Sequence, residues 1–287
     1  MTFNLVAADW RATLLPDLGG AIGSLAFKGH EILRPTPAGA SDVLQTACFP
    51  LVPYANRIAH GRFTFDGAVI QLPVPARFAP HAIHGIGWQR AWEVVQAGPD
   101  RAILQLHAGG DESWPWRFSA RQTVALTARG LKLILSVRNE NVVPMPAGLG
   151  LHPYFPLETG ASLQFAARQV WLGDDSLLPV ETASPDAVQD FAGGAALPEG
   201  RLIDHCYAGW DGLAVLHAGG RTISVRASTN HVHIYVPPEG QFCCIEPVTH
   251  RPDAVNAGNS ASGMAALAPG AELAFDMEIS VSGASAR

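Results

Sequence analysis

The chain has 287 residues, of which 48% are hydrophobic and 15% are charged, and its formal net charge is −6. This composition is typical of a globular chain and excludes an intrinsically disordered one. The acidic balance, together with the lack of any run of Lys and Arg, argues against a nucleic-acid-binding surface. The sequence has no stretch of ~18 apolar residues, so no membrane span is predicted.

The N-terminus and the cysteines indicate a compartment. Asp9 precedes the first Arg and no long apolar stretch follows, so this segment does not resemble a secretory signal peptide. The cysteines are Cys48, Cys206 and the adjacent Cys243 and Cys244. Neighbouring cysteines on a strand point to opposite faces and rarely pair, so we expect no disulfide framework and a reduced, cytoplasmic protein.

Alternation of apolar and polar residues with period two dominates the chain and predicts strands. The first predicted strand, at 62–65, runs into an Asp66-Gly67 turn. Further strands are predicted at 102–107, 132–139, 222–226, 231–236 and 272–281.

Helices are scarce in this pattern. Most of the 29 Gly and 22 Pro fall in the connections, and only residues 184–196 could hold a short helix. No linker, charge run or fixed-period repeat divides the chain. We therefore predict one all-β domain over residues 1–287, built from two packed sheets.

Three residues in unusual local settings are candidates for acid–base chemistry. His84 lies in Ile83-His84-Gly85, and His152 in Leu151-His152-Pro153. Glu246 follows the apolar run 242–245, where a carboxylate is costly to bury unless it is paired. Two imidazoles and a carboxylate are the groups that proton transfer near neutral pH needs.

Each of these residues also has a structural interpretation. His84 could be a turn histidine bonded to a nearby carbonyl, and His152 could serve packing alone. Pro153 restricts His152 to extended geometry. Pro247 is expected to end a strand and to leave Glu246 at the strand tip, facing an opening, although a surface Glu is the commonest alternative.

Two further segments carry groups suited to hydroxyl recognition. Asn56 and Arg57 place an amide and a guanidinium side by side, unless they form a surface loop. Trp210 and Asp211 join an aromatic face to a carboxylate acceptor, which suits a sugar, although a plain Asp-Gly turn is slightly favoured.

Other chemistries find little support. The sequence has no glycine-rich phosphate loop, no zinc-type cysteine spacing and no Gly-x-Ser-x-Gly nucleophile elbow. His231 and His233 with Glu239 resemble the metal ligands of a cupin barrel. A solvent-facing histidine pair before a Pro237-Pro238-Glu239-Gly240 hairpin turn is favoured over that metal site.

Taken in order, these motifs resemble the aldose 1-epimerase (galactose mutarotase) family, whose fold is a large antiparallel β-sandwich. The resemblance rests on Asn56-Arg57-Ile58 with Gly61-Arg62-Phe63, His84-Gly85, Leu151-His152-Pro153-Tyr154-Phe155, Gly209-Trp210-Asp211-Gly212, Ile245-Glu246-Pro247 and Asn256. They span most of the chain, and together they are more specific than any one of them.

The resemblance implies a mechanism for interconverting the anomers of a sugar. Glu246 would be the general base at the anomeric hydroxyl, and His152 the general acid at the ring oxygen. His84 would bond the sugar near the ring oxygen, and whether His84 or His152 is the main acid stays open. Arg57 and Asp211, with Asn56 as a weaker candidate, would anchor the other hydroxyls. No metal or organic cofactor is required.

The substrate is expected to be a neutral monosaccharide. A sister branch that acts on hexose 6-phosphates needs clustered basic groups, and the motif regions here offer only Arg57 and Arg77. Gly85 is followed by Ile86-Gly87 rather than by a second glycine, which leaves galactose, glucose, L-arabinose and L-fucose open. Trp88 and Trp210 are candidate stacking surfaces. The alternatives are a non-catalytic sugar-binding sandwich and, less favoured, a metal-dependent cupin-like enzyme. The sequence does not indicate an oligomeric state.

Overall fold

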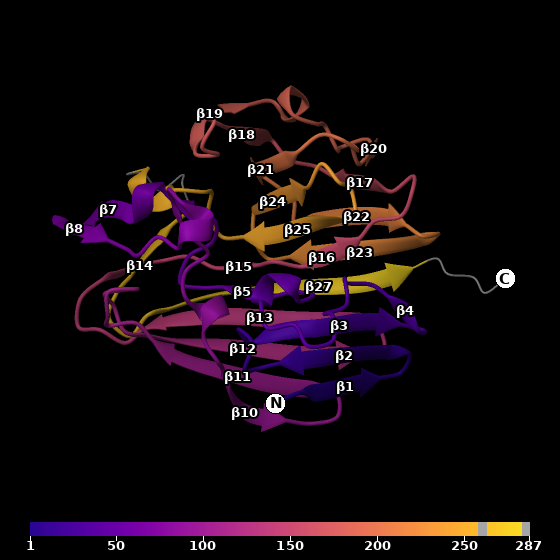
Figure 1. Cartoon of the computed structure of the whole chain (residues 1–287), viewed down its shortest axis with the longest axis horizontal. Helices are drawn as coiled ribbons and strands as arrows, with labels where there is room; N and C mark the ends of the chain where they lie inside the picture. Colours follow the sequence, from indigo (N-terminus) through magenta and orange to yellow (C-terminus); the bar gives the residue numbers. More distant parts are fainter. Residues whose placement is uncertain (258–262, 283–287) are drawn as a thin grey trace.

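The computed structural model describes residues 1–257 and 263–282, and these form an all-β structure of antiparallel strands (Figure 1). The fold is a large β-sandwich, as predicted. Every predicted strand segment lies in a strand. The Asp66-Gly67 turn, with both residues at positive φ, joins β7 (Arg62–Phe65) to β8 (Ala68–Gln71).

The larger of the two main sheets has nine strands. Its order is β10-β11-β12-β13-β27-β23-β22-β17-β20. The bounds of these strands are β10 Glu93–Ala97, β11 Arg101–Ala108, β12 Phe118–Thr127, β13 Gly130–Asn139, β27 Glu272–Ser282, β23 Arg221–Ala227, β22 Leu213–Ala218, β17 Ser162–Phe165 and β20 Ala195–Ala196.

The second main sheet has eight strands, in the order β19-β18-β21-β24-β25-β15-β5, with β16 also pairing β25. Its strands are β19 Pro179–Ala183, β18 Gln169–Gly173, β21 Ile203–Ala208, β24 His231–Val236, β25 Phe242–Val248, β15 Gly150–Leu151, β5 Pro50–Leu51 and β16 Tyr154–Pro156.

Smaller sheets complete the strand structure. A four-stranded sheet is formed by β1 Phe3–Ala7, β2 Trp10–Leu15, β3 Ala21–Phe27 and β4 His30–Glu31, with β1 and β2 lying against β12 (Figure 1). Besides β7 and β8, the two-stranded pairs are β6 Arg57–Ile58 with β9 Ala82–Ile83, and β14 Met145–Ala147 with β26 Ala265–Leu267.

The helices in the described residues are single 3₁₀ turns: η1 Val43–Gln45, η2 Ala59–Gly61, η3 Ala76–Phe78, η4 Gly87–Gln89, η5 Pro185–Ala187 and η6 Ala254–Asn256. The short helix expected within 184–196 is thus the one turn η5. Within residues 1–257 and 263–282, no helix has the length and hydropathy needed to cross a bilayer.

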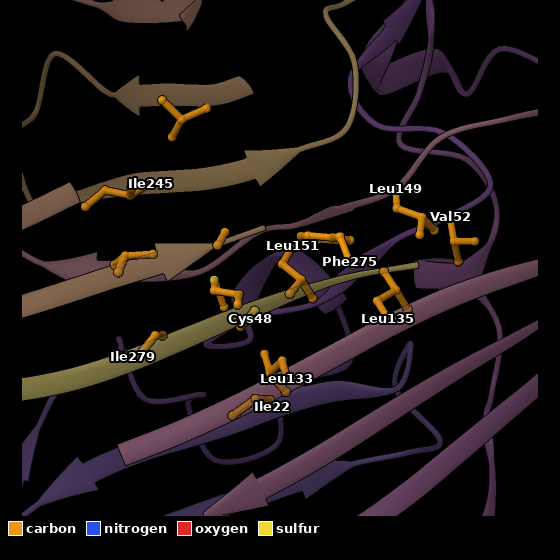
Figure 2. Close-up of a cluster of buried hydrophobic side chains, with 14 of the residues drawn as sticks. Ile22, Cys48, Val52, Leu133, Leu135, Leu149, Leu151, Ile245, Phe275 and Ile279 are labelled. Atoms are coloured by element: carbon orange, nitrogen blue, oxygen red, sulfur yellow. The ribbon is translucent and has the colours of Figure 1, made fainter. Parts of the chain in front are cut away.

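One apolar core joins the two main sheets. Figure 2 shows Leu133 and Ile279, from β13 and β27, approaching the same cluster as Leu151 and Ile245, from β15 and β25. These side chains are fully buried. Since side chains alternate along a strand, the residues between the core positions of the second sheet point to its other face.

That other face of the eight-stranded sheet is covered, and it carries both polar side chains and a second apolar cluster that includes Tyr154, Cys244 and Val248. On β24, Val232 and Ile234 enter the core, whereas His231 and His233 lie on the opposite side. The expectation that these histidines face solvent was wrong, because both are buried. The chain between the four-stranded sheet and β10 folds over this face and provides one wall of a cavity there.

Candidate active site

A cavity of about 360 Å³ lies between the covered face of the eight-stranded sheet and the segment that covers it. The sheet and its connections contribute Asp204, His152, His233 and Glu246, and the covering segment contributes Arg34, Asn56, Arg57 and His84. The predicted residues Glu246, His152, His84, Arg57 and Asn56 are therefore brought together at one cavity, although they come from distant parts of the chain.

Strand pairing sets His152 beside Glu246. Gly150 pairs with Val248 and Tyr154 with Cys244, so His152, midway between Gly150 and Tyr154, lies opposite Glu246. The Nε2 atom of His152 is 3.4 Å from Oε1 of Glu246. Glu246 is not at a strand tip as expected, since β25 continues through Pro247 to Val248. Pro247 is paired with Val232 and sits beside the end of the two-residue strand β15.

Burial shapes the acid–base properties of this pair. Desolvation, followed by the negative charge of Asp204, raises the pKa of Glu246 well above 4.5. Desolvation lowers the pKa of His152 to about 3. Each group is thus favoured in its neutral form, Glu246 as the carboxylic acid and His152 as the imidazole, so the pair shares one titratable proton. Among the described residues, Oε2 of Glu246 and Nδ1 of His152 have no hydrogen-bond partner.

A second histidine–carboxylate pair lies in the same cavity. Nε2 of His233 is 2.6 Å from Oδ1 of Asp204, and Nη2 of Arg57 donates to Oδ2 at 3.0 Å. Burial opposes ionisation of Asp204, but the hydrogen bond and charge of His233 and the charge of Arg57 outweigh it and hold the pKa of Asp204 below its usual range. Asp204 is therefore a fixed carboxylate that accepts hydrogen bonds.

His84 is locked by the backbone of the neighbouring segment. The backbone N–H of His84 donates to the carbonyl of Asn56 at 2.9 Å, and the backbone N–H of Asn56 donates to the ring Nδ1 of His84 at 3.1 Å. Both residues have positive φ, and Gly85 follows where a Cβ would lie 2.3 Å from the carbonyl oxygen of Val52. Because Nδ1 accepts this hydrogen bond, neutral His84 carries its ring hydrogen on Nε2.

The charge state of His84 follows from its surroundings. Desolvation, reinforced by His152 and Arg57, lowers the pKa of His84 well below 6.5. The ring is thus held as a neutral imidazole with an N–H donor at the cavity. Such a group can donate a hydrogen bond to an oxygen atom.

The two arginines that line the cavity each donate hydrogen bonds to other groups of the protein. Arg57 also donates to Oδ1 of Asn56 at 3.2 Å, besides its bond to Asp204. Arg34 donates to the carbonyls of Leu44 and Thr46, and its guanidinium lies 3.8 Å from the ring centroid of Tyr154. Arg77 pairs with Asp42 on the surface and does not line the cavity.

The remaining predicted residues lie outside the cavity lining. Trp88 is buried behind the site, where it packs on Phe49 and donates to the carbonyl of Gly85. Trp210 is buried and donates to the carbonyl of Leu213, and exposed Asp211 accepts from the Leu213 N–H. These two residues form the turn between β21 and β22, as in the plain-turn interpretation.

The cupin-like ligand set is not assembled. Glu239 is exposed in the turn after β24, where the Gly240 N–H donates to the carbonyl of Pro237. His233 is instead bonded to Asp204, and this bond explains why a buried strand histidine was found where a solvent-facing one was expected.

The sequence patterns did not single out Asp204 or Arg34, and they raised His233 only as a possible metal ligand. The signal for Asp204 and His233 was available in the period-two pattern, because Asp204 follows the core residue Ile203 on β21 and His233 lies between Val232 and Ile234 on β24, the strand next to β25. No such pattern marks Arg34, which follows the short strand β4 and reaches the cavity only through the path of the covering segment.

Comparison with known proteins agrees with this fold. The family model described as aldose 1-epimerase matches residues 8–280. The uncharacterized protein YphB of Escherichia coli (strain K12) is 30% identical over 92% of this chain and 93% of its own length. Galactose mutarotase of Rattus norvegicus is 30% identical over 47% of this chain and 39% of its own length.

A solved structure extends the likeness to three dimensions. A provisionally assigned aldose 1-epimerase from Escherichia coli K12 superposes with a TM-score of 0.90 and 29% identity, covering 99% of each chain. The match of the family model over almost the full sequence is decisive. The chain belongs to the aldose 1-epimerase family.

Proposed function

We propose that this protein is a mutarotase, which interconverts the α and β anomers of a neutral free aldose. The observation that carries the proposal is the His152–Glu246 pair, buried at the cavity with 3.4 Å between Nε2 and Oε1. The anomeric hydroxyl and the ring oxygen of a sugar are both bonded to the anomeric carbon. A base for the first and an acid for the second must therefore lie close together, as these groups do.

The reaction needs one titratable proton shared by His152 and Glu246, so that one group can donate a proton while the other accepts one. In the free cavity both groups are neutral and the shared proton lies on Glu246. It must first pass to His152; Glu246, now the carboxylate, then takes the proton of the anomeric hydroxyl while the imidazolium of His152 gives its own to the ring oxygen. The bond between the anomeric carbon and the ring oxygen breaks, and the free aldehyde forms. Rotation about the C1–C2 bond and closure on the other face, with both groups acting in reverse, completes the inversion.

Other cavity residues have supporting roles in this proposal. The Nε2–H of His84 donates to the sugar near the ring oxygen and stabilises the charge that develops there. Asp204, with Arg57 and His233, accepts and donates hydrogen bonds to the remaining hydroxyls, a role that Asp211 was expected to fill. Asn56 fixes Arg57 through its side-chain oxygen.

The substrate class follows from size and charge. A volume of about 360 Å³ is at the small end of ligand cavities and suits a monosaccharide. In the part of the chain that the structure describes, two cationic side chains line the cavity: Asp204 neutralises the charge of Arg57, and Nη2 of Arg34 is bonded to the carbonyls of Leu44 and Thr46. A phosphate would need guanidinium or ammonium groups free to bind it, so a neutral sugar fits better than a sugar phosphate.

Anomer exchange tests the proposal directly. Saturation-transfer NMR or polarimetry would follow D-galactose, D-glucose, L-arabinose and L-fucose, with and without the protein, at a pH where spontaneous exchange is slow. We expect accelerated exchange for at least one sugar, and the ranking identifies the substrate. Sugar binding without acceleration would contradict a mutarotase and support a carbohydrate-binding module.

A further inference from the structure

Cys244 is a buried thiol beside His152 and Glu246, and the proposed mechanism does not use it. On β25, Phe242, Cys244 and Glu246 point to the same face because they are two residues apart. Cys244 pairs with Tyr154, two residues beyond His152 on the neighbouring segment. One nitrogen of His152, the sulfur of Cys244 and one carboxylate oxygen of Glu246 all lie within 4.8 Å of one another.

The spacing of these atoms suits a tetrahedral metal ion. A Zn²⁺ ion with nitrogen and oxygen ligands at about 2.1 Å holds those ligands about 3.4 Å apart. Nε2 of His152 and Oε1 of Glu246 are already 3.4 Å apart. The Cys244 sulfur, within 4.8 Å of one nitrogen of His152 and one oxygen of Glu246, would take the third position after moving to the separation of about 3.6 Å that tetrahedral coordination needs, and the cavity provides the fourth.

The donor set selects the kind of ion. Imidazole, thiolate and carboxylate together suit Zn²⁺ and similar borderline cations, whereas Mg²⁺ and Ca²⁺ prefer oxygen ligands alone. Within residues 1–257 and 263–282, this is the one group of three or more His, Cys, Asp or Glu side chains close enough to share an ion. His152 and Glu246 line the cavity, so an ion can approach from there.

We propose that His152, Cys244 and Glu246 form a binding site for a thiophilic divalent cation such as Zn²⁺, and that the bound ion inhibits the protein. The ion would occupy the lone pairs that accept and transfer protons in anomer exchange. Metal binding itself does not depend on the proposed function, whereas the inhibition rests on it. Because the thiol must lose its proton to ligate, binding releases protons and strengthens as the pH rises.

Cobalt spectroscopy of the full chain tests the binding step without any sugar. Co²⁺ is added to the metal-free protein, and the thiolate-to-cobalt charge-transfer band and the visible bands of tetrahedral cobalt are recorded. We expect both in the wild type and in Cys243→Ala, and the loss of the charge-transfer band in Cys244→Ala. Cys243 is the matched control, because it is an equally buried neighbouring thiol on the core face of the same strand.

Inhibition is measured on the same three proteins. After treatment with a chelator, Cys244→Ala should exchange anomers at the wild-type rate and keep the wild-type circular dichroism spectrum. Loss of an outer partner of a metal ligand costs about 10–100-fold in affinity, so loss of a ligand should raise the inhibitory Zn²⁺ concentration by about 100-fold or more. Cys243→Ala should remain as sensitive as the wild type.

The outcomes separate the two proposals. A Co²⁺ spectrum without a thiolate band, or one that Cys244→Ala leaves unchanged, overturns the metal site whatever the enzymatic result. A Cys244-dependent spectrum in a protein that accelerates no anomer exchange supports the metal site and counts against the mutarotase. Equal Zn²⁺ inhibition of all three proteins overturns the inhibitory role.

Discussion

The cavity holds two histidine–carboxylate pairs that use the same residue types in opposite ways. In one, His233 and Arg57 surround Asp204, and the pKa of that carboxyl is lowered. In the other, His152 lies 3.4 Å from Glu246, burial dominates and the pKa of the carboxyl is raised. A carboxylate beside a guanidinium stays ionised and binds, whereas one buried without such a direct cation holds a proton to higher pH and can exchange it.

The largest effect is expected from changing the proposed proton-transfer residues of the His152–Glu246 pair. Glu246→Gln keeps the shape but cannot accept the anomeric proton, and His152→Asn removes the acid. We expect each to lower kcat for anomer exchange by about 10²–10⁴-fold, measured by saturation-transfer NMR.

Sugar binding by these variants is the control. Titration followed by NMR should show affinities near that of the wild type, because the binding pair around Asp204 is intact. Near-wild-type turnover of Glu246→Gln would show that Glu246 is not the base. Near-wild-type turnover of His152→Asn would move the acid role to His84.

A smaller effect, on binding rather than on turnover, is expected at the Asp204–His233 pair. Asp204→Asn removes the charge that Arg57 and His233 share, and hydrogen bonds to charged groups contribute about 1.5–3 kcal/mol. We expect KM to rise by about 10–100-fold with a smaller change in kcat, measured by initial rates over a range of sugar concentrations. A loss confined to kcat would place Asp204 in proton transfer instead.

The pH dependence of the rate reports the protonation state of the His152–Glu246 pair. The pair gains a second titratable proton only when His152 is protonated, with a pKa of about 3. It loses its one titratable proton only above the raised pKa of Glu246. We therefore expect a bell-shaped profile of kcat/KM. Its acid limb should lie well below pH 6.5, and its alkaline limb well above pH 4.5. An acid limb near pH 6.5 would contradict a buried neutral His152.

The smallest effect is expected at the turn that the sequence had marked for sugar binding. Asp211→Ala removes the hydrogen bond to the Leu213 N–H, worth about 0.5–1.5 kcal/mol of stability. KM and kcat should stay at wild-type values, because Asp211 does not line the cavity. A thermal unfolding scan and a sugar titration check both points, and a KM increase like that of Asp204→Asn would return Asp211 to the binding site.

The strands and several candidate residues could be predicted because they rest on local patterns. Alternation along 231–236 and 272–281 gives strands, Asp66-Gly67 gives a hairpin turn, and the settings of His84, His152 and Glu246 stand out within a few residues. Local chemistry thus indicated which groups were unusual and what kind of fold carried them.

The tertiary structure decided which unusual groups meet. The pairing that puts His152 opposite Glu246, and Asp204 next to His233, joins segments far apart in the chain. It placed His233 in the cavity rather than in solvent and left Asp211 and Trp210 in a turn. Burial and neighbouring charge, which set whether a carboxylate binds or transfers protons, arise only from such long-range packing, and no local pattern contains them.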